Sequence, residues 1–150
     1  MGPTRTHILG GTSVMHATTV ADAMHHGIIA CQPSATLAEV ARTMVLGNLH
    51  CVAIVSDRPP GPSKLHAVIT DLDLLRWAAG ANAHHPARQI ARSPAIKIKT
   101  DASLYEATEL MVDHHVDHLV VIDTDGGAPV GILSSLDVAR ALAGTPSRER

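Results

Sequence analysis

The chain has 150 residues, a formal net charge of −2, 45% hydrophobic residues and 17% charged residues. This balance gives no electrostatic reason to expect a nucleic acid polymer or an anionic membrane as a partner. Trp77 and Tyr105 are the only residues of the Phe, Trp and Tyr class, so platforms for stacking bases are nearly excluded. The length suits one compact domain or two closely packed halves.

The sequence gives no sign of export or of membrane insertion. No apolar run approaches the roughly 20 residues that a membrane span needs, and the N-terminus lacks the apolar core of a signal peptide. The two cysteines, Cys31 and Cys51, lie in apolar stretches and form neither a disulfide framework nor a CxxC pair. We therefore expect a cytoplasmic protein with two buried thiols.

The first 80 residues alternate between short apolar runs and helical patterns. Residues 1–17 show no clear periodicity, and we expect a flexible N-terminal arm there. Thr36-Leu37-Ala38-Glu39 is a capping box, which predicts a helix that ends at Gly47-Asn48. The other expected elements are a helical turn over 20–24, strands over 28–31, 51–55 and 65–69, a proline-rich loop over 57–64, and a helix over 72–79 closed by Gly80.

The same order of elements starts again after a short connector over residues 81–86. Ser103-Leu104-Tyr105-Glu106 is a second capping box, and it predicts a helix with Met111 on its apolar face. The other expected elements are strands over 96–99, 119–122 and 130–133, a turn over 125–127, a last helix that stops at Gly144, and a tail over 145–150.

An internal repeat accounts for this order. The capping boxes begin at Thr36 and Ser103, 67 positions apart, and Met44 and Met111 have the same spacing. Repeats cannot usually bury their apolar faces alone, so the two halves should pack on one another about a pseudo-two-fold axis. The sequence therefore predicts a mixed fold of helices and strands, α+β in class, built from two related halves.

A hydroxyl residue and an aspartate recur at the corner where a strand meets a helix in each half. The two copies are Thr70-x-x-Asp73, which follows Ala67, and Ser134-x-x-Asp137, which follows Gly131. An ionised carboxylate can accept hydrogen bonds from two adjacent hydroxyls, as a ribose diol requires. The same spacing is also that of a capping box, and one copy alone favours the cap. Two copies within a longer repeat favour a binding site.

Each repeat resembles a CBS domain, and the tandem pair resembles a Bateman module. The matching residues are Val20-x-Asp22-x-Met24, the capped helix through Met44, the strand 52–55 and Ala67-x-x-Thr70-x-x-Asp73 in the first repeat, and Ser103 to Met111, 118–123 and Gly131-x-x-Ser134-x-x-Asp137 in the second. The resemblance covers about residues 18–144. It implies two β-α-β-β-α repeats, over 18–80 and 87–144, with clefts between them that take adenosine derivatives such as AMP, ADP, ATP or S-adenosylmethionine.

The resemblance also implies roles for individual residues. Asp73 and Asp137 would hold the ribose hydroxyls, with Thr70 and Ser134 assisting near the ribose or phosphate. Backbone groups around Ile29-Ala30 and Ile96-Lys97 would recognise the adenine edge, and His50 and His118 stand near positions where basic side chains approach phosphate. Arg76 and Arg140 follow the aspartates by one helical turn, so each would either approach phosphate or pair with its own aspartate. Ala67 departs from the family's usual glycine.

Other chemistry has little support in the sequence. The 11 histidines include three adjacent pairs, but no pair has a cysteine or an acid at ligand spacing. No Ser-His-Asp or Cys-His grouping suggests catalysis. We therefore expect no catalytic residue, no metal site and no cofactor beyond a regulatory adenosine nucleotide.

The predicted function is a regulatory binding module that senses this nucleotide and passes its state to an unidentified partner protein. The alternative is a structural dimerisation module whose clefts are empty or vestigial. Under both hypotheses we expect a homodimer, because each repeat has short helices with more apolar residues than one inter-repeat contact would cover. Examples are Leu74, Leu75, Val138 and Leu142.

Overall fold

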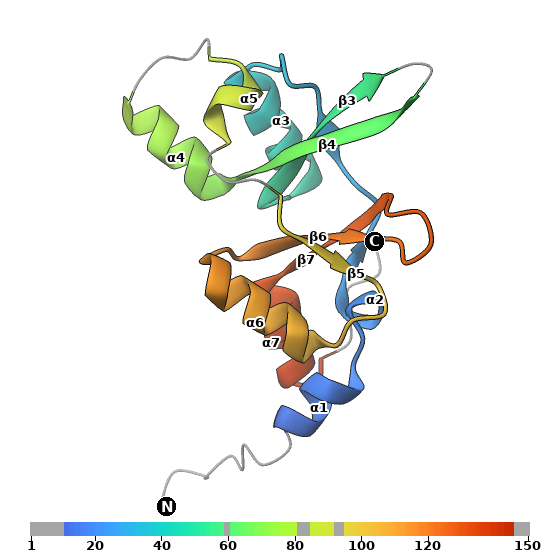
Figure 1. Cartoon of the computed structure of the whole chain (residues 1–150). Coiled ribbons are helices and arrows are strands. Elements are labelled where there is room, and N and C mark those ends of the chain that lie inside the picture. Colours follow the sequence, from blue (N-terminus) through green and yellow to red (C-terminus); the bar gives the residue numbers. More distant parts are fainter. Residues whose placement is uncertain (1–10, 59–60, 81–84, 92–94, 146–150) are drawn as a thin grey trace, which may run out of the picture. The chain divides into compact units, whose positions relative to one another are not determined.

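Two compact units make up the molecule, and each is built from parts of both repeats. The structure is a computed structural model that describes residues 11–58, 61–80, 85–91 and 95–145 (Figure 1). One unit combines Met1–Gly27 with Ile96–Arg150, and the other consists of Ile28–Ala95. We call them the terminal unit and the central unit.

The terminal unit is a four-stranded sheet with helices that pack against it. Its helices are α1 (Gly11–Ala17), α2 (Val20–Ala23), α6 (Leu104–His114) and α7 (Ser135–Leu142), and its strands are β1 (His25–His26), β5 (Lys97–Lys99), β6 (His118–Ile122) and β7 (Pro129–Ser134). The strand order is β1-β7-β6-β5, with β5 and β6 parallel and the other pairs antiparallel. Strand β1 lies at the edge of this sheet, directly after α2. It carries His25, which belongs to the candidate site described below.

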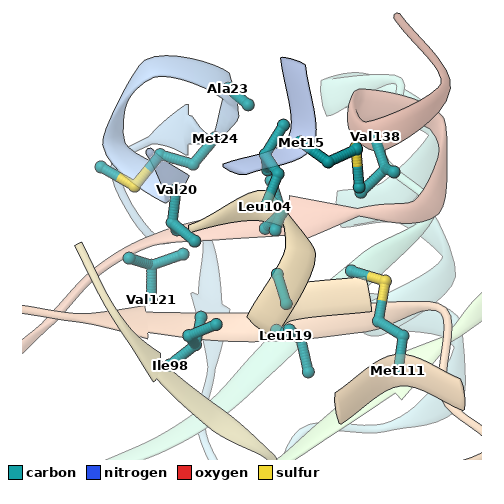
Figure 2. Close-up of a cluster of buried hydrophobic side chains, with 12 residues drawn as sticks. Met15, Val20, Ala23, Met24, Ile98, Leu104, Met111, Leu119, Val121 and Val138 are labelled. Carbon is teal, nitrogen blue, oxygen red and sulfur yellow. The ribbon is translucent and has the colours of Figure 1, made fainter. Parts of the chain in front are cut away.

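The core of the terminal unit lies between this sheet and its helices (Figure 2). Leu119 and Val121 alternate along β6 and point into the core, as the two-residue period of a strand requires. Leu104 and Met111 supply the apolar face of α6 that the sequence pattern predicts. Val20, Ala23 and Met24 complete the core from the segment around α2.

The central unit is a smaller sheet covered by helices. Its strands are β2 (Ala30–Cys31), β3 (Cys51–Arg58) and β4 (Gly61–Thr70), in the order β2-β3-β4, and its helices are α3 (Leu37–Gly47), α4 (Asp71–Gly80) and α5 (Ala87–Ile90). Val40 and Met44 of α3 pack with Val52, Ile54 and Ile69 of the strands. The mixed fold and the two repeats that the sequence predicts are both confirmed.

Capping residues fix both ends of the two long equivalent helices. Thr36 caps α3 and Ser103 caps α6, each in a capping box with the glutamate three residues later. At the other ends Asn48 (φ 49°) and His115 (φ 53°) adopt the left-handed conformation that closes a helix. Both capping boxes are as predicted, and the two closing residues are again 67 positions apart.

The two repeats exchange their first helical turns. The turn α2 of the first repeat packs in the terminal unit, where Val20 N–H donates to Ala102 O at 2.8 Å. Its equivalent in the second repeat, α5, packs in the central unit, where Ala87 N–H donates to Ala35 O at 2.7 Å. Donors and acceptors are each related by the 67-residue spacing, so the two bonds are copies of one interaction. The compact units therefore divide the chain differently from the sequence repeats.

Several expectations differ from the structure. Only one of the two expected buried thiols is buried, because Cys51 is buried whereas Cys31 is partly exposed. Residues 11–17 are helix α1 and not an arm, because Met15 is buried and His16 stacks on Tyr105 with 4.4 Å between ring centroids. Most of the expected loop over 57–64 is a β-hairpin, in which Arg58 pairs with Gly61 and Ser56 with Lys64. Pro62 is compatible with this because it lies in β4, which is an edge strand. The helix α5 was not expected, and residues 1–10, 59–60, 81–84, 92–94 and 146–150 lie outside the described residues.

Candidate functional site

The Ser134–Asp137 corner of the terminal unit holds a buried carboxylate. Ser134 ends β7 and caps α7, and Asp137 is the third residue of that helix. Asp137 Oδ2 accepts hydrogen bonds from the Ser134 backbone N–H at 2.8 Å and from its hydroxyl at 2.7 Å. The Asp137 side chain is only 2% exposed. The corner is thus a capping box, and its carboxylate is fixed where the sequence predicts a ribose-binding group.

Two basic side chains occupy the other acceptor positions of Asp137. Arg140 Nη1 donates to Oδ1 at 2.8 Å. Of the two roles expected for this arginine, the structure shows the ion pair with its own aspartate. His25 Nδ1, from β1, lies 3.3 Å from each carboxylate oxygen. A carboxylate has about four acceptor positions, and four groups surround this one. The arrangement satisfies the buried charge without any ligand.

A small cavity adjoins Asp137. Its volume is about 150 Å³, and its lining residues are Thr18, Asp22, Ala23, Asp137, Arg140, Ala141 and Thr145. Hydrogen bonds from the hydroxyl and the backbone N–H of Thr19 lower the pKa of Asp22 below its ordinary value of 3.8. The cavity is smaller than the roughly 300–1,000 Å³ of typical small-molecule pockets, so in this conformation it has room for only part of a nucleotide.

The Thr70–Asp73 corner of the central unit has the same plan with fewer contacts. Asp73 Oδ2 accepts from the backbone N–H and the hydroxyl of Thr70, both at 3.1 Å. Arg76 Nη1 is 3.7 Å from Asp73 Oδ1, an ion pair beyond hydrogen-bond distance. Among the described residues no histidine contacts this aspartate. Asp73 is therefore the less saturated carboxylate of the two.

The backbone positions expected to recognise adenine lie at equivalent places in the two units. The Ile29 carbonyl accepts from Ala53 N–H at 3.1 Å in the central unit, and the Ile96 carbonyl accepts from Val120 N–H at 2.9 Å in the terminal unit. Each carbonyl keeps a second lone pair that another donor could use. The next residues, Ala30 and Lys97, belong to β2 and β5 and are exposed.

The two histidines expected near phosphate are not equivalent. The 67-residue spacing pairs His50 with Asp117, and His118 with Cys51. His50 Nδ1 contacts Asp71 Oδ2 at 2.9 Å, and His118 Nδ1 contacts Asp117 Oδ1 at 2.8 Å. The His50 side chain is 68% exposed and that of His118 only 9% exposed. Of the two, His50 is the one open to an approaching anion.

The close approach of two strands requires a glycine at position 131, which the sequence did not indicate. A Cβ atom added there would lie 2.3 Å from the His25 carbonyl oxygen and 3.0 Å from Met24 Sδ. The glycine therefore lets β1 approach β7, and through β1 it places His25 beside Asp137. His25 is the site residue that sequence reasoning missed, since no local pattern connects positions that are 112 residues apart.

The described residues show neither a metal-ligand cluster nor a membrane-spanning helix. They contain no group of three or more His, Cys, Asp or Glu side chains that could hold a metal ion. None of the described helices is long and apolar enough to cross a membrane.

Comparison with known proteins places the chain in a family. The family model described as CBS domain matches residues 20–80 and 87–144. Hypoxic response protein 1 of Mycobacterium tuberculosis is 29% identical over 128 residues, which cover 83% of this chain and 85% of that protein. A crystal structure of Hypoxic Response Protein I with two coordinated zinc ions is 28% identical, with a TM-score of 0.66 and coverage of 82% and 98% of the two chains.

Two other solved structures share the fold at lower identity. The CBS domain protein PAE2072 from Pyrobaculum aerophilum, complexed with AMP, has a TM-score of 0.72 at 24% identity, covering 85% of this chain and 100% of that chain. The CBS domain pair of protein MJ0100, in complex with 5′-methylthioadenosine and S-adenosyl-L-methionine, has a TM-score of 0.74 at 24% identity, with 85% and 97% covered. With two matches to the family model and the fold of these pairs, the chain belongs to the CBS domain family and contains a tandem pair of CBS domains.

Proposed function

We propose that this protein is a regulatory module that binds an adenosine nucleotide at the Asp137 corner, the Asp73 corner or both, and relays the bound state to a partner protein. One observation carries the proposal: each repeat ends a strand in a hydroxyl residue whose partner is a buried aspartate at the start of a helix. Related CBS domain pairs are solved with AMP and with S-adenosyl-L-methionine, which supports a ligand of this class.

The chemistry of the corners fits a ribose. Asp73 and Asp137 accept the two adjacent hydroxyls, while the hydroxyls of Thr70 and Ser134 stay close to the ribose or phosphate. The backbone at Ile29-Ala30 and Ile96-Lys97 recognises the adenine edge, and His50 or His118 approaches phosphate. Binding favours one arrangement of the protein over another, so the nucleotide acts by population shift. No step in this proposal breaks or forms a covalent bond, so we propose no enzyme activity.

A homodimer is part of the proposal. Of the four apolar residues that the sequence suggested, Leu75 and Leu142 are exposed, at 66% and 53%, whereas Val138 is buried and Leu74 packs against the core. Three other large apolar side chains on helices are exposed in the single chain, at 78% for Val45, 81% for Leu46 and 64% for Val112. Their burial against a second copy would stabilise a dimer by the hydrophobic effect. Light scattering at micromolar concentration should give twice the monomer mass, and a monomer there would contradict this part of the proposal.

A second candidate is a dimerisation module that binds no ligand. It is favoured by the saturated acceptor positions of Asp137 and by the small cavity beside it. The Hypoxic Response Protein I structure holds two coordinated zinc ions, and the described residues of the present chain contain no cluster of three metal-ligating side chains.

Thermal unfolding with and without ligand separates the two candidates. The probes are AMP, ADP, ATP and S-adenosylmethionine, each tested separately. A ligand at 100 times its dissociation constant should stabilise the protein by about 2.7 kcal/mol, which is readily measured. No shift with any probe at millimolar concentration would favour the dimerisation module. Incubation with ATP, followed by an assay for ADP and phosphate, should show no hydrolysis.

A further inference from the structure

We propose that His25 is a built-in competitor of the ligand at Asp137: it occupies an acceptor position that a ribose hydroxyl needs, and the nucleotide must displace it. The inference rests on the proposed function, since it assumes that Asp137 receives a ribose. Its basis is the set of contacts around one buried carboxylate, which the terminal unit supplies entirely from its own residues.

The carboxylate has no acceptor position to spare. Ser134 donates twice to Oδ2, and Arg140 donates once to Oδ1. His25 lies within 3.3 Å of both oxygens and takes the position that remains. A ribose diol would bring two more donors to a group with about four acceptor positions. At least one of the present partners must therefore leave before even one ribose hydroxyl can donate to the carboxylate.

His25 is the partner that leaves at the lowest cost. Its distance of 3.3 Å is the longest of the contacts, against 2.8 Å for Arg140 and 2.7 Å for the Ser134 hydroxyl. Its side chain is 42% exposed, whereas that of Arg140 is 23% exposed, so water can solvate a displaced imidazole more readily. Ser134 is held by the cap of α7, and its loss would leave helix N–H groups unsatisfied.

The backbone that carries His25 is also suited to move. The strand β1 has two residues and lies at the edge of its sheet, so it is held by few hydrogen bonds. Gly27 follows it with φ +87°, in the region where glycine is free to rearrange. The central unit begins at the next residue, Ile28. Displacing His25 would thus perturb the chain segment that joins the two units.

Calorimetric titration of His25→Ala tests the inference, with AMP and 2′,3′-dideoxy-AMP as probes. If the histidine blocks the site for most of the time, its removal raises the competent fraction and tightens AMP binding by about threefold to tenfold. The dideoxy compound lacks both hydroxyls, so its affinity should change by less than about twofold. The control is His26→Ala, which removes an exposed histidine from the same strand and should leave both affinities unchanged.

Each outcome decides a different question. Unchanged or weaker AMP binding by a folded His25→Ala variant overturns the competition while the proposed function stands. An equal gain for both probes overturns it too, because the gain would not involve the hydroxyls. If neither the wild type nor His25→Ala binds AMP, ADP, ATP or S-adenosylmethionine, the proposed function fails, and the inference fails with it. If His25→Ala does not fold, His25→Gln replaces it, and the expected gain in AMP affinity is then below threefold. Unfolding of both variants would show that His25 has a purely structural role.

Discussion

Gly131→Ala should lower the stability of the terminal unit by crowding β1 away from β7. The added Cβ would lie 2.3 Å from the His25 carbonyl oxygen, and contacts under 3.0 Å are essentially never made by real Cβ atoms. The obstacle is backbone, so no side chain can rotate to make room. Strand β1 would have to shift by about 1 Å to reach ordinary contact distance.

The expected loss of stability follows from the contacts that this shift disturbs. It would strain the hydrogen bond from Gly27 N–H to Val130 O at 2.8 Å and move Met24, whose side chain is buried in the core. Extra methyl groups forced into packed sites cost about 1–3 kcal/mol. At about 2–4 °C per kcal/mol for a chain of this size, the melting temperature should fall by about 2–12 °C.

Differential scanning calorimetry measures this effect, and hydrogen exchange localises it. The amide of Gly27 should exchange faster in Gly131→Ala, while amides of α3 in the central unit should not. Gly126→Ala is the matched control, because a Cβ there meets nothing within 4 Å and the residue has no positive φ. A Gly131→Ala variant with the melting temperature of the wild type would refute the argument that this glycine admits β1.

The other predictions concern carboxylates, caps and a thiol. Asp137→Ala should lower the melting temperature and weaken nucleotide binding by about one to two orders of magnitude, as expected for hydrogen bonds to a charged group; calorimetry that finds the affinity intact in a folded variant removes the ribose assignment. Ser103→Ala should destabilise α6 by about 1 kcal/mol, measured by urea denaturation, with Thr124→Ala at an exposed position after β6 as a control. Hydrogen bonds from the Thr36 and Ser103 backbone lower the pKa of Glu39 and Glu106 below the ordinary 4.5. The stability that these two carboxylates contribute is therefore complete above pH 4.5 and is lost as the pH falls through the lowered pKa. Melting curves of Glu39→Gln and the wild type should accordingly converge in acid. Burial raises the pKa of the Cys31 thiol, and iodoacetamide at pH 8 should modify it more slowly than a free cysteine.

Much of the fold could be predicted because its signals are local. The capping boxes at Thr36 and Ser103 need only four consecutive residues each, and both helices start where these predict. The helix α5 could also have been found, because it lies 67 residues after α2, but Ala87–Ile90 is too short for its own periodicity to indicate a helix. The hairpin around Arg58 and Gly61 was missed because its prolines favoured a loop.

The candidate site could be predicted only in part. The Ser134–Asp137 pair is three residues apart and follows from the pattern, and the same is true of Arg140 one turn later. His25 and the role of Gly131 depend on β1 pairing with β7, a contact across more than 100 positions. No pattern in a single sequence carries such a contact. The structure also distinguishes the two corners in a way that the sequence does not. The Asp137 corner keeps the family's glycine, but Asp73 is the aspartate with fewer bonded partners.

The exchange of first helical turns gives this chain a short covalent route between its units. His25 contacts Asp137 in the terminal unit, and four residues later the Ile29 carbonyl is bonded to β3 of the central unit. Four residues span at most about 14 Å when fully extended, so the segment that joins the two attachments is short. A backbone movement at His25 has only this segment, with Gly27 in it, before it reaches β2. If ligand binding at Asp137 displaces His25, the central unit can respond to it without a contact of its own to the ligand.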